Sequence, residues 1–187
     1  MRHPLYAGTM MENDPLYQSW MIEGTSFNRM LDCGDRYNQW VQNALEYLPR
    51  NVLDEHKDRL AFFAMAHRDG CRVARVVREN REIIILSEHI LPKAGATEGQ
   101  ADVRYFIYVV LHEVAHAVKQ HRSPLYDCLT PEEVAAQESE ANDLALKWFN
   151  DHISALGNPY LPSLSREEVR AAEAGSRAVM DRLYGGV

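Results

Sequence analysis

Residues 102–120 constrain the fold of this chain more than any other segment, because they are apolar on nearly every side until the last turn. A helix of this kind is buried rather than lying on a surface, so we expect it to form the centre of the domain. The segment also carries His112, Glu113 and His116. Burying two imidazoles and a carboxylate is costly unless these groups have partners. The sequence therefore predicts a central helix whose two histidines and glutamate have a binding partner.

The spacing of the two histidines identifies a metal ion as that partner. His112 and His116 are four residues apart, so on a helix they project from one face, one turn apart. This geometry suits two imidazole ligands of a single zinc ion. Glu113 lies beside the pair, where it can take a proton from a metal-bound water. Catalytic zinc keeps three protein ligands and one open position, so a third ligand must come from another segment.

Two glutamates of a later predicted helix are candidates for the third ligand. Glu138 and Glu140 point about 200° apart on a helix, so only one of them can face the metal. Glu138 is favoured because Asn142 follows it on the same face, where it could orient a ligand histidine. Glu140 remains the alternative. A solvated acidic helix start, favoured by the helix dipole, is the interpretation without a metal.

Other zinc arrangements do not fit the residues that follow His116. A metzincin would need a third histidine at Arg122 and a glycine at Lys119. A compact site with a histidine four residues after His116 would need it at Gln120. His121 is off register for both patterns, and we expect it to be a cation near the helix C-terminus rather than a ligand.

The chain thus carries a two-part pattern, His112-Glu113-x-x-His116 followed by Glu138-x-Glu140-Ala141-Asn142-x-x-Ala145. This pattern resembles the gluzincin branch of the zincin metallopeptidases, and is most similar to small bacterial-type domains called ImmA/IrrE-like. The resemblance covers about residues 82–150. It implies that Glu138 is the third ligand of one Zn²⁺ ion. It also implies that a strand at residues 83–86 lies beside the active-site cleft and binds an extended peptide by adding it to the sheet edge.

A deformylase-like amide hydrolase is an alternative enzyme. Peptide deformylase has a similar size and a cysteine after glycine some forty residues before its paired histidines, and Cys71 lies 41 residues before His112. The Leu-Ser that normally follows that cysteine is Arg72-Val73 here, and no Gly-x-Gly-Leu-Ala-Ala-like segment precedes it. We therefore expect Cys71 to be a turn or strand residue.

The order of predicted elements indicates an α+β domain at residues 35–187, preceded by an N-terminal arm or irregular cap at residues 1–34. Helices are predicted at residues 35–48, 102–120, 130–155 and 165–184, with Asp35, Asp102, Thr130 and Ser165 as N-terminal caps. Strands are predicted at residues 60–66, 72–77 and 82–86 as a three-stranded meander, although the first could instead end a helix begun near Val52. The expected architecture is zincin-like: a small mixed or antiparallel sheet packed on the active-site helix, with a second ligand-bearing helix.

Composition limits the partners of the protein. Lys and Arg number 20 against 27 acidic residues, a net charge of −7, so we expect no nucleic-acid or membrane partner. Three irregularly spaced cysteines, with no visible signal segment or membrane span, favour a cytoplasmic location. The expected partner is a peptide or protein substrate, and the sequence does not indicate an oligomeric state.

These observations predict a zinc-dependent metallopeptidase with Glu113 as general base. A regulatory or binding protein with a structural or inactive zinc site is the alternative, as is an enzyme kept latent by residues 1–33 lying in the cleft. A tyrosine or histidine should hydrogen-bond the oxyanion, and the candidates are Tyr126, His152 and Tyr160. Cys128 could cover the zinc as a thiolate, but an ordinary loop cysteine is the simpler interpretation.

Overall fold

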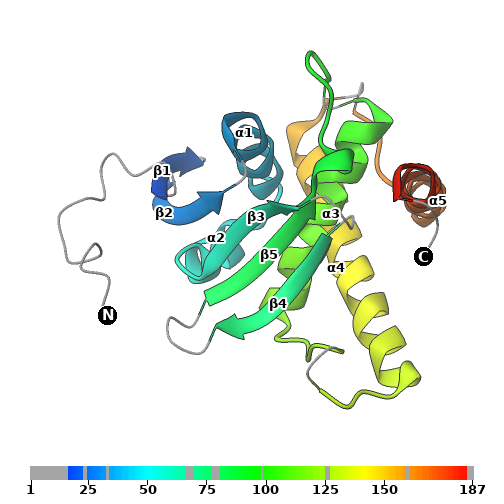
Figure 1. Ribbon diagram of the computed structural model, residues 1–187. Helices are drawn as coiled ribbons and strands as arrows, with labels where there is room; N and C mark the ends of the chain where they lie inside the picture. Colours follow the sequence, from blue (N-terminus) through cyan, green and yellow to red (C-terminus); the bar gives the residue numbers. More distant parts are fainter. Residues whose placement is uncertain are drawn as a thin grey trace.

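A sheet with the strand order β1-β2-β3-β5-β4 forms one layer of the molecule (Figure 1). The structure is a computed structural model that describes residues 17–22, 25–32, 34–65, 70–76, 81–97, 99–124, 127–158 and 161–184. The strands are β1 (Tyr17–Ile22), β2 (Thr25–Asp32), β3 (Leu60–Met65), β4 (Gly70–Val76) and β5 (Arg81–Ser87). The sheet is mixed, because β3 runs parallel to both β2 and β5, while β1 and β4 are antiparallel to their neighbours. The α+β class is confirmed.

The predicted meander is wrong, although its three strands exist. β3 does not pair with β4; it pairs in parallel with β5, and β4 lies outside β5. The apolar runs explain the order: Leu60, Phe62, Ile84 and Leu86 are all 2% exposed or less, as expected for interior strands. The sequence of β4 includes the charged residue Arg72 among apolar ones, which suits a strand at the edge of a sheet. β5 is therefore not a free edge, and the prediction that residues 83–86 pair with a peptide is also wrong.

Two strands precede the first helix in a region where the sequence predicted an irregular arm. β1 and β2 pair in antiparallel register from Tyr17↔Met30 to Ile22↔Thr25. β2 then joins the rest of the sheet through Leu31↔Phe62 and Asp32↔Phe63. Residues 1–33 lack a clean polar–apolar alternation, which is why periodicity does not predict these strands. Residues 1–16 lie outside the described residues, so a latent arm in the cleft stays a prediction.

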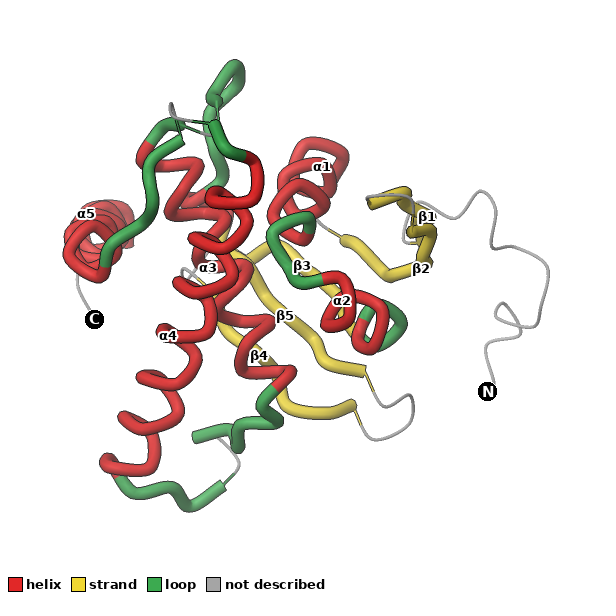
Figure 2. Tube along the Cα trace, turned by 180° about the vertical axis from the view of Figure 1, so that it is seen from behind, coloured by secondary structure: helices red, strands yellow, loops and turns green. Residues whose placement is uncertain are grey.

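Helices α1 to α4 lie on one face of the sheet, as the opposite views in Figures 1 and 2 show. The helices are α1 (Gly34–Leu45), α2 (Arg50–His56), α3 (Ala101–Val118), α4 (Pro131–Leu156) and α5 (Arg166–Tyr184), with a short 3₁₀ helix η1 (Glu88–Ile90) after β5. The short α2 ends before β3 begins, so residues 60–65 are a strand and not the end of a helix. α5 lies at the side of the molecule away from the N-terminal strands (Figure 1).

Helix α3 is the centre of the core, as its apolar sequence predicted. It contacts α1, α4, α5 and the strands β4 and β5, which explains why it is buried on nearly all sides. Val103, Ile107 and Val110 are β-branched and intrinsically poor helix formers, so packing rather than propensity stabilises this helix. Its N-cap is Gln100, not Asp102, which lies in the first turn. None of the described helices is long and apolar enough to cross a membrane.

The first turns of α4 and α5 are stabilised by local hydrogen bonds that the sequence predicted. Thr130 and Glu133 form a reciprocal capping box at the start of α4. Ser165 and Glu168 make the same pair of bonds at the start of α5. Arg104, buried in α3, binds Glu168 at 3.1 Å and so ties the beginning of α5 to the core.

Candidate metal centre

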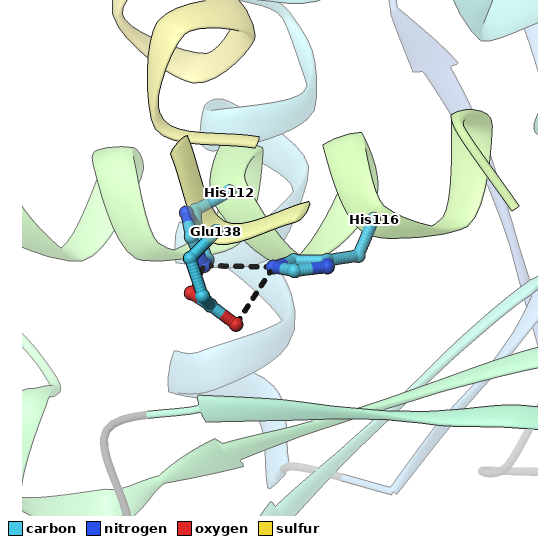
Figure 3. Close-up of side chains that lie close together, drawn as sticks. All are labelled: His112, His116 and Glu138. Carbon is cyan, nitrogen blue, oxygen red and sulfur yellow. Dashed lines mark hydrogen bonds and ion pairs between the residues drawn. The ribbon is translucent and has the colours of Figure 1, made fainter. Parts of the chain in front are cut away.

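Three side chains from two helices converge on one point, and Figure 3 shows their nitrogen and oxygen atoms facing one another. His112 and His116 project from the same face of α3, as their spacing predicted, and their Nε2 atoms are 3.0 Å apart. Glu138 comes from the second turn of α4. Its Oε2 lies 3.3 Å from Nε2 of His112, and its Oε1 lies 3.6 Å from Nε2 of His116.

These separations fit a tetrahedral zinc ion. With bond lengths of about 2.0–2.1 Å, two ligands of a tetrahedral site stand about 3.3–3.4 Å apart. The observed distances of 3.0, 3.3 and 3.6 Å lie around that value. The donors, two imidazoles and one carboxylate, are also a ligand set found in catalytic zinc sites. His112, His116 and Glu138 could therefore hold one metal ion.

Packing between α3 and α4 determines which glutamate enters the centre. Ala141 and Ala145 have no exposed surface, and these small residues let the two helices approach closely. Glu138 lies on the same face, one turn before Ala141, and reaches the histidines. Glu140 points elsewhere, to Lys119 and His121. The structure thus brings Glu138 to the two histidines and keeps Glu140 out of the ligand group.

Ionic interactions within the centre shift the pKa values of two candidate ligands, Glu138 and His112. Hydrogen bonds with His112 first, and with His116 second, hold the pKa of the Glu138 carboxyl far below its usual range. Burial lowers the pKa of His112, but its hydrogen bond to Glu138 and the charges of Glu113, Glu138 and Glu173 outweigh that effect, so its pKa ends above the ordinary value. A proton on His112 would compete with a metal ion, because only the neutral imidazole binds metal.

Glu113 lies on α3 next to His112, and its residue surface is only 7% exposed. Its charge raises the pKa of both His112 and Tyr108, so it is within electrostatic reach of the centre. A buried carboxylate within electrostatic reach of the histidines could exchange a proton with a group bound there.

Asn142 does not orient a ligand histidine as predicted. Its Oδ1 accepts a hydrogen bond from the Tyr108 hydroxyl. The Tyr108 ring in turn lies beside the imidazole of His112, with 5.9 Å between ring centroids. Burial, and then the charges of Glu173, Glu138 and Glu113, raise the pKa of Tyr108 well above its ordinary value, so the hydroxyl stays a donor. Within the described part of the chain, Nδ1 of His112 has no hydrogen-bond partner.

His121 has a different role from the helix-end cation that we expected. It is buried, with 7% of its surface exposed, and its Nδ1 lies 2.9 Å from Nδ1 of His116. Its Nε2 lies 3.2 Å from Oε2 of Glu140. Lys119 and then His121 hold the pKa of the Glu140 carboxyl below its usual value. Helical spacing did not reveal this contact, because His121 lies beyond the end of α3.

Of the remaining candidates, none that the structure describes belongs to the ligand group. Tyr126 and Tyr160, proposed for the oxyanion, lie outside the described residues. His152, the third candidate, stacks on Tyr47 with 4.1 Å between centroids. Cys128 is a free, exposed cysteine and is not among the ligand group. Cys71 lies in β4 opposite Ile85, a strand position as expected.

Comparison of the chain with protein-family models, with curated proteins and with solved structures gave no match.

Proposed function

We propose that this protein is a zinc-dependent metallopeptidase of zincin-like fold. His112, His116 and Glu138 would hold one Zn²⁺ ion, and Glu113 would be the general base. The observation that carries the proposal is the convergence of three ligand atoms at 3.0–3.6 Å, a spacing that fits tetrahedral zinc. The proposal includes a peptide or protein substrate and the cytoplasmic location that the cysteine usage favours.

The exposure of the centre favours a catalytic site over a structural one. Structural zinc sites are closed by four protein ligands and are typically rich in cysteine. Here three ligands converge, and the Glu138 side chain is 49% exposed while those of His112 and His116 are 15% and 12% exposed. This arrangement leaves one side of the centre open to solvent, where a substrate could enter.

The reaction requires a base and a proton carrier next to the metal. Zinc bound at this centre would lower the pKa of a water molecule and polarise the substrate carbonyl. Glu113 would accept the water proton on a carboxylate oxygen and later pass it to the leaving amine. The low exposure of Glu113 keeps competing water away from that carboxylate. Glu138, whose carboxyl pKa is already far below its usual range in the metal-free centre, would supply the negative charge of the ligand set.

The free sheet edge suggests where an extended substrate would bind. β4 is the outermost strand at its end of the described sheet, and it packs along α3, the helix that carries the centre. An extended peptide could add to this edge through main-chain hydrogen bonds. The proposed docking edge is therefore β4, instead of residues 83–86.

Metal analysis tests the ligand set. Protein purified without added metal should contain about one zinc per chain. Glu138→Ala should lose most of it, because the variant lacks one of three ligands. Glu132→Ala is the matched control, since Glu132 lies exposed in the first turn of the same helix and should keep the metal. Absence of zinc from the wild type, even after zinc is added back, would exclude the proposed centre.

Cleavage of a peptide library, read by mass spectrometry, tests the activity. Wild-type protein should cleave some members, lose activity with a chelator and regain it with zinc. Glu113→Gln should keep zinc and fold but lose turnover, by about 10²-fold or more, because only the general base is removed. A Glu113→Gln variant that cleaves as fast as the wild type would show that the assigned base is wrong. A zinc-loaded wild type without turnover would favour a structural or regulatory role.

A further inference from the structure

His116, the proposed ligand in the last turn of α3, contacts a series of side chains that the proposed reaction does not use. Nδ1 of His116 lies 2.9 Å from Nδ1 of His121, and Nε2 of His121 lies 3.2 Å from Oε2 of Glu140. The Lys119 ammonium forms an ion pair with the other oxygen of Glu140. The order is therefore His116, His121, Glu140, Lys119, running from the candidate centre towards the surface.

The protons of this series of side chains have one consistent arrangement when His116 is a ligand. Nε2 of His116 faces His112 and Glu138, so it must offer its lone pair to the metal. The ring proton of His116 is then on Nδ1 and is donated to Nδ1 of His121. His121 in turn carries its proton on Nε2 and donates it to the Glu140 carboxylate. Each ring nitrogen of His116 and His121 thus has one role, and none of these four nitrogens lacks a partner.

We propose that His121 and Glu140 are positioning residues that fix the ring orientation and the tautomer of His116 for metal binding. Partners of this kind raise the basicity of a ligand histidine and hold its ring in place. The inference rests on the proposed zinc centre. It assigns to Glu140 a role that is separate from the ligand role of Glu138, although both residues lie on α4.

The backbone at the end of α3 places His121 against His116. His121 N–H binds the carbonyl of His116 at 3.1 Å, and Gln120 N–H binds the carbonyl of Ala117 at 3.2 Å. Gln120 has φ of 53°, the left-handed conformation. These features define a Schellman motif, in which the second residue after the helix folds back on the last turn. In such motifs the two residues at these positions often make an apolar contact. Here they are His121 and His116, and their imidazoles form a hydrogen bond.

The two ligand histidines differ in this respect. Nδ1 of His112 has no hydrogen-bond partner within the described residues, whereas Nδ1 of His116 faces His121. His121 has a side chain that is only 6% exposed, so water cannot easily replace its hydrogen bonds. The structure therefore assigns the support of the centre to the His116 side.

Zinc affinity measured by competition with a chromogenic chelator tests the inference. His121→Phe removes the acceptor for His116 and should weaken zinc binding by about 10–100-fold, the range for partners of ligand histidines. His121→Asn should restore part of the loss, because its amide oxygen can accept at the position of Nδ1. Glu140→Gln should weaken binding less than His121→Phe. The matched control is His152→Phe, a histidine that stacks on Tyr47 and should not change zinc affinity.

Cobalt substitution supplies a readout that a merely structural role would not move. The visible spectrum of Co²⁺ bound to His121→Phe should differ from that of the wild type, because the His116 ring is no longer held. If His121→Phe does not fold, Glu140→Gln decides the matter through the same affinity and spectrum. Wild-type zinc affinity and cobalt spectrum in both His121→Phe and Glu140→Gln would overturn the inference and leave the zinc proposal intact. A wild type that binds no zinc would instead overturn the proposed function.

Discussion

The two halves of the candidate metal centre are built in different ways. The His112 half lies inside α3, where Tyr108 is one turn earlier on the same helix and Glu113 is the next residue. The His116 half lies in the last turn, where the partner His121 comes from beyond the helix end. The surroundings of a ligand inside a helix follow helical spacing, whereas those of a ligand in the last turn depend on how the chain continues.

The largest expected effect on zinc binding comes from removing either of the two histidine ligands. His112→Ala and His116→Ala should both lose most of the bound zinc, but their metal-free forms should differ in stability. His116→Ala leaves Nδ1 of buried His121 without its partner, while His112→Ala removes a nitrogen that already lacks one in the described structure. His116→Ala should therefore cost about 1–3 kcal/mol more free energy of unfolding. Urea unfolding of the chelator-treated proteins measures the difference, and equal losses would show that the halves are energetically alike.

The next effect is the pH dependence of zinc binding. Only the neutral imidazole binds metal, and the raised pKa of His112 means that protons compete from a higher pH than usual. The proton that His112 must release should lower zinc affinity by about tenfold per pH unit below that pKa. Glu138, whose pKa is lowered, stays ionised throughout this range. Chelator competition across about pH 4.5–8.5, two units on either side of the ordinary histidine pKa of about 6.5, measures the curve.

Glu173→Gln sharpens the same measurement, because the charge of Glu173 on α5 helps to raise the pKa of His112. In this variant the loss of affinity should begin at a lower pH. Glu167→Gln, in the first turn of the same helix, is the control and should leave the curve unchanged. A curve that does not move with Glu173→Gln would show that α5 does not influence the His112 half.

The smallest effect is expected from Tyr108→Phe. The change removes the hydrogen bond to Asn142 but keeps the ring beside His112. Asn142 is half-buried and can turn to water, so the loss of unfolding free energy should be only about 0.5–1.5 kcal/mol. Zinc affinity should stay close to that of the wild type. A fall as large as that of His121→Phe would contradict the view that the His116 half supports the centre.

Glu138 enters the centre for a different reason from the one that the sequence predicted. Glu138 was favoured because Asn142, four residues later, was expected to orient a ligand histidine. In the structure Asn142 accepts a hydrogen bond from Tyr108 instead. What distinguishes Glu138 from Glu140 is the close contact of α4 with α3 at Ala141 and Ala145. Alanines are a weak sequence signal, because their effect depends on which helix they face. The register of a helix against another segment is a property of packing.

The strands show the same limit on prediction. The positions of β3, β4 and β5 follow from apolar runs and turn residues, and the structure agrees within about two residues. Their order does not follow from these signals, because parallel pairing of β3 with β5 joins segments separated by another strand. β1 and β2 were not predicted, since their sequences do not alternate cleanly. Pairing energy between distant segments decides such features.

By itself the sequence determined the central apolar helix, the facing pair His112 and His116, and the capping boxes that begin α4 and α5. The histidine pair and the capping boxes depend on contacts between residues at most four apart, which are encoded in spacing, and the burial of the helix follows from its apolar composition. Only the tertiary structure decided the order of the sheet, the entry of Glu138 into the centre and the contact of His121 with His116. Strand order and helix register depend on packing between distant segments, and the His121 contact depends on a chain reversal after α3, neither of which helical periodicity records.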